Sequence, residues 1–221
     1  MTPVEPGPTP ARNDDELPAG RFSEWIAGAV SAEAAGTEVD VPCGSCTACC
    51  RSSYFVHIQP HEVETLRRIP VALRFPAPGL PAGNVLLGYD ERGHCPMLVD
   101  DRCSIYEHRP LTCRAYDCRI FAAAGLSPEA DGKVAIAERV RRWRFAHTTT
   151  TDEVEHAAVV AAASFLSARG DSFPGGKPPT SAGQIASSAV KVHRAFLGED
   201  GAGHVAIVEP TAEAVQVALL R

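Results

Sequence analysis

The chain has 221 residues, of which 45% are hydrophobic, enough for one large domain or for one domain with an appendage. Its formal net charge is −6, because 27 Asp and Glu residues oppose 21 Lys and Arg residues. This balance argues against general binding to nucleic acid or to an anionic membrane, since both attract a clustered positive surface.

The N-terminal segment, "MTPVEPGPTPARNDDELPAG", is rich in proline and acidic residues. Proline fixes φ and removes a hydrogen-bond donor, so we expect residues 1–20 to form a disordered tail. The segment lacks the basic start and apolar run of a secretory signal. The longest largely apolar stretch, Ala157 to Leu166, is too short to cross a bilayer. We therefore expect a cytoplasmic protein with no membrane partner.

The next stretch, "FSEWIAGAVSAEAAG", predicts a short amphipathic helix that Ser23 caps and Gly36 ends. The sequence "CGSCTACC" follows, and in it Cys43, Cys46 and Cys49 form two overlapping C-x-x-C units. Two intervening residues allow a tight turn to place both sulfurs on one ion.

Bacterial ferredoxins use such a C-x2-C-x2-C run for three ligands of a cubane [4Fe-4S] cluster. Here the ferredoxin continuation x3-C-P is missing, so a fourth ligand must come from elsewhere in the chain. Cys50 directly follows Cys49, and neighbouring side chains usually point apart. The two residues therefore serve different centres, or one of them is not a ligand.

A second cysteine group contains Cys95, Cys103, Cys113 and Cys118. The sequence around the first two predicts a hairpin, with an Asp-Glu-Arg-Gly turn after an apolar run and two short strands around Asp100-Asp101. Pro110 predicts a helix start, which places Cys113 near the first turn. Cys113 and Cys118 would diverge by about 140° on one helix. Either the helix breaks near Asp117 or the two cysteines serve different partners.

All eight cysteines of the chain lie in these two stretches. A reducing cytosol disfavours disulfides, and inert thiols would be scattered through the core, so metal ligation is the favoured interpretation. The eight thiolates allow two zinc ions with four sulfurs each, one cubane plus a zinc ion, or one cluster with spare thiols. The candidate metal ligands are Cys43, Cys46, Cys49, Cys50, Cys95, Cys103, Cys113 and Cys118.

Several residues near the cysteines have a structural and a functional interpretation. His94 is expected to be an exposed turn residue rather than a zinc ligand. Arg109 and Arg114 either offset thiolate charge or form surface salt bridges. Tyr106 and Tyr116 are expected to be packing groups with satisfied hydroxyls. No catalytic residue is predicted.

The C-terminal part predicts helices at about Lys133 to Phe145, Asp152 to Ala168 and Ala182 to Leu197, with an N-cap among Thr148 to Thr151. A short strand in "GHVAIVEP" and a last helix capped by Thr211 follow. We therefore expect an α+β fold, mainly α, in which an irregular cysteine-rich module with a small hairpin packs against alanine-rich helices. The expected division is a tail at 1–20, a cysteine module with an N-terminal helix at 21–125, and a helical region at 126–221.

The pattern C-x2-C-x2-C-C, followed by G-x-C-P-x-L, C-S-I-Y-E-x-R-P and C-R-x-Y, resembles the YkgJ-type cysteine-cluster family of zinc- or iron-chelating proteins. The resemblance covers about Val41 to Phe121 and includes all eight cysteines in order. It implies metal binding. A flagellin lysine N-methylase is similar in its cysteine motifs, but this chain shows no Gly-rich nucleotide turn.

The sequence thus predicts a metal-binding protein that holds an iron–sulfur cluster or zinc through its eight cysteines. Such a protein would deliver, store or sense its metal, or would act as an adaptor for a protein partner, without binding nucleic acid. The alternative is a metal-dependent enzyme that modifies a protein side chain, as a lysine N-methylase does.

Overall fold

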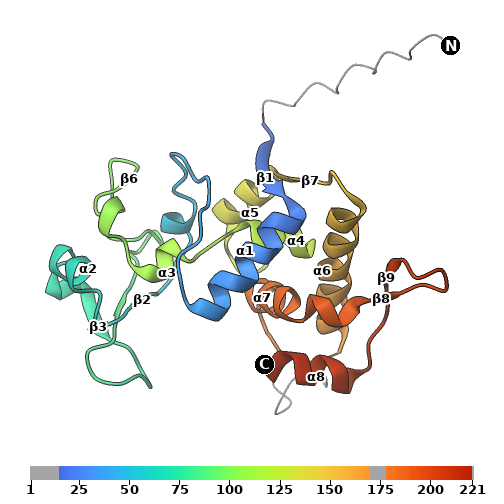
Figure 1. Cartoon of the computed structure of the whole chain (residues 1–221). Coiled ribbons are helices and arrows are strands. Elements are labelled where there is room, and N and C mark those ends of the chain that lie inside the picture. Colours follow the sequence, from blue (N-terminus) through green and yellow to red (C-terminus); the bar gives the residue numbers. More distant parts are fainter. Residues whose placement is uncertain (1–14, 170–177, 221) are drawn as a thin grey trace, which may run out of the picture.

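The computed structural model describes residues 15–169 and 178–220. It has the predicted α+β character with helix predominating, and its helices and small strands are arranged in two parts (Figure 1). The part drawn in cyan and light green contains the small sheet and residues 95–113, whereas the other part is a pack of helices. Most of the predicted tail at 1–20 lies outside the described residues, and its last residues, from Leu17, form β1.

The first helix, α1 (Phe22–Ala35), follows directly on β1 (Leu17–Arg21). Gly36 ends it in the left-handed conformation, as predicted, with its N–H bound to the carbonyls of Ala32 and Glu33. The predicted cap was wrong: Arg21 is the N-cap and Ser23 lies inside the first turn. The reason is tertiary, because the carboxylate of Asp152 accepts the Ser23 N–H at 3.0 Å and replaces a local cap.

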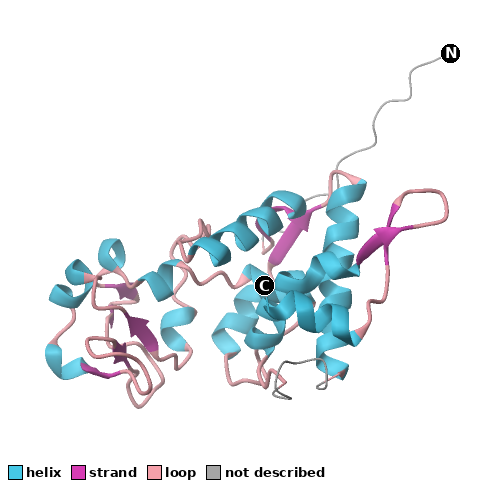
Figure 2. Ribbon diagram, turned by 60° about the horizontal axis from the view of Figure 1, so that its bottom comes forward, coloured by secondary structure: helices cyan, strands magenta, loops and turns pink. Residues whose placement is uncertain are grey.

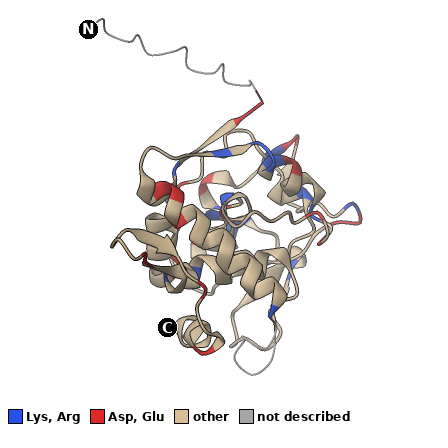
Figure 3. Cartoon of the chain, turned by 90° about the vertical axis from the view of Figure 1, so that its right-hand side faces the viewer, with Lys and Arg blue, Asp and Glu red and all other residues tan. Residues whose placement is uncertain are grey.

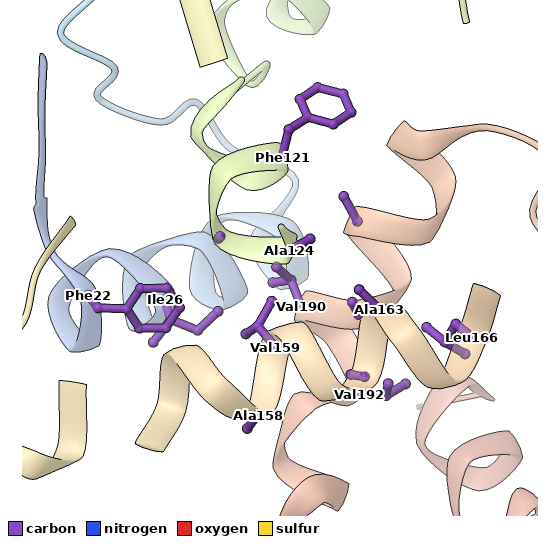
Figure 4. Close-up of a cluster of buried hydrophobic side chains, with 14 of the residues drawn as sticks. Phe22, Ile26, Phe121, Ala124, Ala158, Val159, Ala163, Leu166, Val190 and Val192 are labelled. Atoms are coloured by element: carbon purple, nitrogen blue, oxygen red, sulfur yellow. The ribbon is translucent and has the colours of Figure 1, made fainter. Parts of the chain in front are cut away.

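The main hydrophobic core lies among the helices, as the alanine-rich pattern predicted. α1 packs there with α4 (Arg119–Ala124), α5 (Val134–Val140), α6 (Thr150–Ala168), α7 (Ala182–Val192) and α8 (Ala212–Leu220). Its large, fully buried side chains include Phe22, Phe121, Ile136, Val159, Leu166, Val190 and Val215, several of which Figure 4 shows between α1, α4, α6 and α7. Small alanines at the crossings let these helices approach closely.

Two predicted helices are shorter than expected. The first was wrong beyond Val140, because Trp143–Ala146 form β7, which pairs in parallel with β1. Trp143 is buried and Arg144 exposed, so this segment follows the two-residue period of a strand. The second predicted helix ends at Val192 rather than Leu197, where a 3₁₀ turn leads into β8 (Leu197–Glu199).

The remaining C-terminal predictions were confirmed. α6 begins at the predicted threonines, with Thr149 as N-cap in a reciprocal pair with Asp152. β9 (Val205–Ile207) is the predicted short strand and pairs with β8. Thr211 caps α8, since its hydroxyl accepts the Ala214 N–H at 3.2 Å. Strands thus occur at several separate places rather than in one central sheet (Figure 2).

The cysteine-rich part has a core of its own. Its sheet has the order β2 (Val56–Ile58), β4 (Val85–Leu87), β3 (Arg74–Pro76), and α2 (Val63–Arg68) lies between β2 and β3 in sequence. The buried residues of this second core are Val56, Ile58, Ile69, Leu87 and Ile105. This core is much smaller than the helical one, so it contributes less burial energy.

The predicted hairpin around Asp100-Asp101 was confirmed. β5 (Leu98–Val99) pairs with β6 (Arg102–Cys103), and both aspartates have positive φ values of 48° and 58°. Such a pair of positive φ angles is typical of a tight hairpin turn. The apolar run before it also forms a strand, β4, but pairs with β2 and β3.

Charged residues near β7 are paired rather than free. Arg144 binds Glu16 at 3.0 Å and Arg141 binds Glu129 at 3.2 Å, and Figure 3 shows blue and red segments close together in this upper region. Arg139 instead reaches the first cysteine run, where it donates to the carbonyls of Pro42 and Cys43. α5 therefore braces the start of that run.

Candidate metal centres

The first cysteine run folds as a tight turn followed by a 3₁₀ turn. The Cys46 N–H donates to the Cys43 carbonyl at 3.0 Å, and Gly44 between them has φ +57°. A residue with a Cβ is strained at this φ, which explains the glycine. The 3₁₀ turn contains Cys49–Arg51. The predicted C-x-x-C turn is thus confirmed for the first pair.

Cys118 lies within electrostatic reach of this run, although it is far from it in sequence. It is the N-cap residue of α4, it is buried in the helical core, and its sulfur accepts the indole N–H of Trp143 at 3.2 Å. Burial raises the pKa of Cys118 to about 11, and the thiols of Cys43 and Cys46 contribute to that rise. Burial also raises the pKa of Cys49, with the Cys118 thiol as the next cause. We call these four residues, Cys43, Cys46, Cys49 and Cys118, the core-side group.

The other four cysteines lie within electrostatic reach of one another, and two of them pack against the second core. The Cys95 N–H donates to the Cys50 carbonyl at 2.7 Å, and Cys95 and Cys103 pack against the small core. Burial raises the pKa of Cys50 to about 11, followed in order by the thiols of Cys95, Cys103 and, from the first run, Cys46. Burial raises the pKa of Cys113 to about 12, followed by Cys50, Cys95 and Cys103. We call these residues, Cys50, Cys95, Cys103 and Cys113, the hairpin-side group.

The break between Cys113 and Cys118 is what separates the second cysteine stretch into two groups. Cys113 lies on α3 (Leu111–Arg114), which ends before Asp117, and Asp117 accepts the Arg119 N–H at the start of α4. The first sequence-based explanation is confirmed, because the helix ends between the two cysteines, and the two thiols have different neighbouring thiols. Cys49 and Cys113 are exposed as whole residues, yet protein atoms crowd their sulfurs enough to disfavour the thiolate.

The donor set fits a thiophilic metal. All eight cysteines are free thiols, and soft sulfur donors select zinc and iron–sulfur clusters over magnesium or calcium. Within residues 15–169 and 178–220, no three His, Cys, Asp or Glu side chains already converge tightly enough to hold one ion. Metal binding therefore requires the thiols of a group to draw together and lose their protons.

Arg109 lies between the two groups. Its guanidinium carries the positive charge that lowers the pKa of both Cys43 and Cys113 against the effect of burial. It stands 3.9 Å from the ring centre of Tyr106, and its buried Nε has no hydrogen-bond partner. Arg114 has the other predicted role, a salt bridge to Glu38 at 2.7 Å.

Tyr116 and Lys133 make contacts near the thiols that the sequence did not predict. The Tyr116 hydroxyl is satisfied as predicted, because it forms a hydrogen bond of 3.1 Å with the Tyr54 hydroxyl. Burial raises the pKa of Tyr116 strongly, and the charge of Tyr54 is the next cause. Lys133 stands 4.4 Å from the Tyr54 ring centre and donates to the Ser52 and Ser53 carbonyls. Only tertiary structure reveals this contact, because Lys133 lies far along the chain.

The last two predictions for single residues concern Tyr106 and His94. Tyr106 is exposed, and the Arg109 guanidinium lies over its ring. His94 lies in the predicted turn, where its N–H donates to the Asp90 carboxylate at 2.8 Å, but it is half-buried rather than exposed.

In the described part of the chain, no helix is long and apolar enough to span a bilayer.

The cysteine-rich segment matches a family model. The model, named CxxCxxCC and described as "putative zinc- or iron-chelating domain", matches residues 42–140. No curated protein and no solved structure matches the chain. The match extends beyond the predicted end at Phe121 to the end of α5. Lys133, the N-cap of α5, donates to the Ser52 carbonyl, and Arg139 in α5 donates to the Cys43 carbonyl. Residues 42–140 of this chain are thus similar to the CxxCxxCC zinc- or iron-chelating domain, and this segment contains all eight cysteines.

Proposed function

We propose that this protein binds zinc or an iron–sulfur cluster through all eight cysteine thiolates, and that the metal-loaded form is the functional one. The observation that carries the proposal is that the eight free thiols, from two distant stretches of the sequence, lie within electrostatic reach of one another. A reducing, cytoplasmic setting would keep them available for metal. With a resident metal, the protein would store, deliver or sense that metal, or present it to a protein partner.

The raised thiol pKa values support this function for a chemical reason. A buried neutral thiol becomes a thiolate only when a cation compensates the charge, so zinc or iron binding would stabilise the ionised form and release protons. Trp143 would then direct its N–H to the Cys118 sulfur, a bond that strengthens when the sulfur is anionic. Zinc would act as a structural clasp, whereas an iron–sulfur cluster would add redox capacity.

The proposal is tested on the full chain purified without oxygen. Elemental analysis for zinc and iron, with an absorption spectrum, counts the metals and separates zinc from iron–sulfur. Thiol titration of the native protein should find few reactive groups, and chelation should expose more. A protein with no bound metal and eight freely reactive thiols would refute the proposal.

We propose a metal-dependent enzyme as the second candidate function, because the lining of one pocket includes the two sequence neighbours of Cys118. The pocket has a volume of about 390 Å³ and lies against Asp117 and Arg119, the two residues that flank Cys118. Its remaining charged lining residues are Arg21, Glu24, Glu38 and Asp40. Four carboxylates and two guanidinium groups favour a cationic ligand such as a lysine ammonium group.

A binding measurement tests this second candidate. Titration calorimetry with Nα-acetyl-lysinamide should detect binding to the metal-loaded protein. Gly28→Leu places a side chain in open space on the pocket wall, so it should abolish binding while the metal content stays unchanged. Absence of binding to the metal-loaded protein would refute a lysine-directed activity at this pocket.

A further inference from the structure

We infer that the eight cysteines form two separate four-thiolate centres, which are linked through the peptide bond between Cys49 and Cys50. One centre consists of the core-side group, Cys43, Cys46, Cys49 and Cys118, and the other of the hairpin-side group, Cys50, Cys95, Cys103 and Cys113. This inference rests on the proposed metal-binding function and adds to it the number of centres and the ligands of each.

The first argument is the geometry of the adjacent pair. Cys49 and Cys50 begin a 3₁₀ turn, in which successive side chains diverge by about 120°. The Cys118 thiol has the largest electrostatic effect on Cys49, whereas Cys95 and Cys103 have the largest effects on Cys50, and the Cys50 carbonyl accepts the Cys95 N–H. The two neighbouring thiols therefore lie toward different groups, and a single centre would require one of them to turn back.

The second argument is that each group is attached to a different hydrophobic core. Cys118 belongs to the helical core, and Ala48 of the first run packs against the same core. Cys95 and Cys103 pack instead with the small core around Ile58 and Leu87. Because packed cores resist deformation, thiols fixed to different cores cannot exchange between centres without large movements.

The third argument is electrostatic. Four thiolates leave a zinc ion, or a [4Fe-4S]²⁺ cluster, with a net charge of about −2, so two neighbouring centres repel each other. Arg109 lies within electrostatic reach of Cys43 in one group and Cys113 in the other. Its buried Nε lacks a hydrogen-bond partner, so it is free to serve the thiolates. A cation at this junction would screen the two centres from each other.

The test compares two double variants of the full chain that remove the same number of thiols. Cys46→Ser with Cys49→Ser removes two ligands of one proposed centre, and the bound metal should fall to about half, or one of two different metals should be lost. Cys49→Ser with Cys50→Ser damages both proposed centres, and nearly all metal should be lost. Metal content and the absorption spectrum are the readouts.

Far-UV circular dichroism shows whether each variant keeps its helices. If a double variant fails to fold, the single variants Cys49→Ser and Cys50→Ser replace it, and mass spectrometry under native conditions counts the metals left in each. Equal metal retention in the two double variants, or total loss in either single variant, would overturn the two-centre assignment. Wild-type protein without metal would instead refute the proposed function itself.

Discussion

Asp152 shows how much a single buried side chain does in this fold. Its carboxylate is fully buried and accepts hydrogen bonds from the Ser23 N–H at 3.0 Å and from the N–H and hydroxyl of Thr149 at 2.9 and 2.8 Å. Arg21 adds an ion pair at 3.2 Å. One carboxylate thus starts α6 and fixes the start of α1, which explains why Ser23 is no cap.

The pKa of Asp152 gives the first prediction. Burial alone would raise it, but the hydrogen bonds from Ser23, Thr149 and Thr148 outweigh burial and lower the pKa far below its ordinary value of 3.8. A carboxyl with a lowered folded-state pKa stabilises the protein above the unfolded-state pKa, and this contribution is lost progressively as the pH falls below it. Asp152→Asn should therefore lower the Tm by several degrees at pH 7.

The pH dependence supplies the control. The Tm difference between wild type and Asp152→Asn should persist down to about pH 5 and narrow below about pH 4, where the unfolded chain binds a proton. Glu153→Gln, at the next and exposed position of α6, should change the Tm little at any pH. A difference that stays constant from pH 7 to pH 3 would contradict a role for the charge.

At the scale of elements, Arg119 joins segments that lie far apart in the sequence. Its side chain donates to the carbonyls of Ala19 in β1 and Asp40 before the first cysteine run, at 3.1 and 2.8 Å. It also forms a nearly buried ion pair with Asp117 at 2.8 Å, and Asp117 in turn accepts the Trp25 indole N–H at 2.8 Å. This network holds the α3–α4 junction, and with it Cys118, against α1.

Arg119→Ala should lower the free energy of unfolding by about 3 kcal/mol, because it leaves Asp117 with a buried, poorly compensated charge. Urea denaturation measures this change. Arg92→Ala is the matched control, since the Arg92–Asp90 pair is exposed and should contribute less than about 1 kcal/mol. Similar losses for the two variants would show that the Arg119 network is not stabilising.

Local signals predicted elements well where the stabilising partner is near in sequence. Gly36, Thr149 and Thr211 were all identified as helix ends or caps, because each bonds to its own helix. The prediction failed at β7, where an arginine-rich stretch with good helix propensity forms a strand. Its partner β1 lies near the start of the described chain, far from β7 in sequence, and no local pattern contains that information.

The same limit applies to the candidate site. The cysteine spacing predicted the eight candidate ligands and different directions for Cys49 and Cys50. It did not indicate which distant thiol each one meets, because that depends on the break between α3 and α4. Trp143 and Lys133, which contact Cys118 and Tyr54, were likewise beyond reach of spacing rules.

At the scale of the whole molecule, the two cores differ in how much they depend on metal. The helical core buries large side chains such as Phe22 and Leu166, whereas the second core is built from a few side chains and a short sheet. Ligation by the hairpin-side group would therefore supply much of the stability of the smaller part, as in other small metal-dependent folds.

Hydrogen exchange of the metal-loaded and metal-free forms tests this difference. On metal removal we expect residues 95–118 to lose most of their protection, because their elements are short and their core is small. Amides of α6 and α7 should keep theirs, since they pack by apolar burial. Equal protection of 95–118 in both forms would mean that the site is preformed and only carries its metal.

The parallel pairing of β1 with β7 has a consequence for biosynthesis. Leu17 pairs with Trp143, so the ladder encloses the entire cysteine-rich domain between its two strands. A ribosome releases the chain from the N-terminus, and β1 therefore has no partner until all eight thiols have emerged. Trp143 pairs with Leu17 in this ladder, and its indole N–H also donates to the Cys118 sulfur. Under the proposed function, Cys118 would therefore stay open to metal loading during translation until Trp143 has been made.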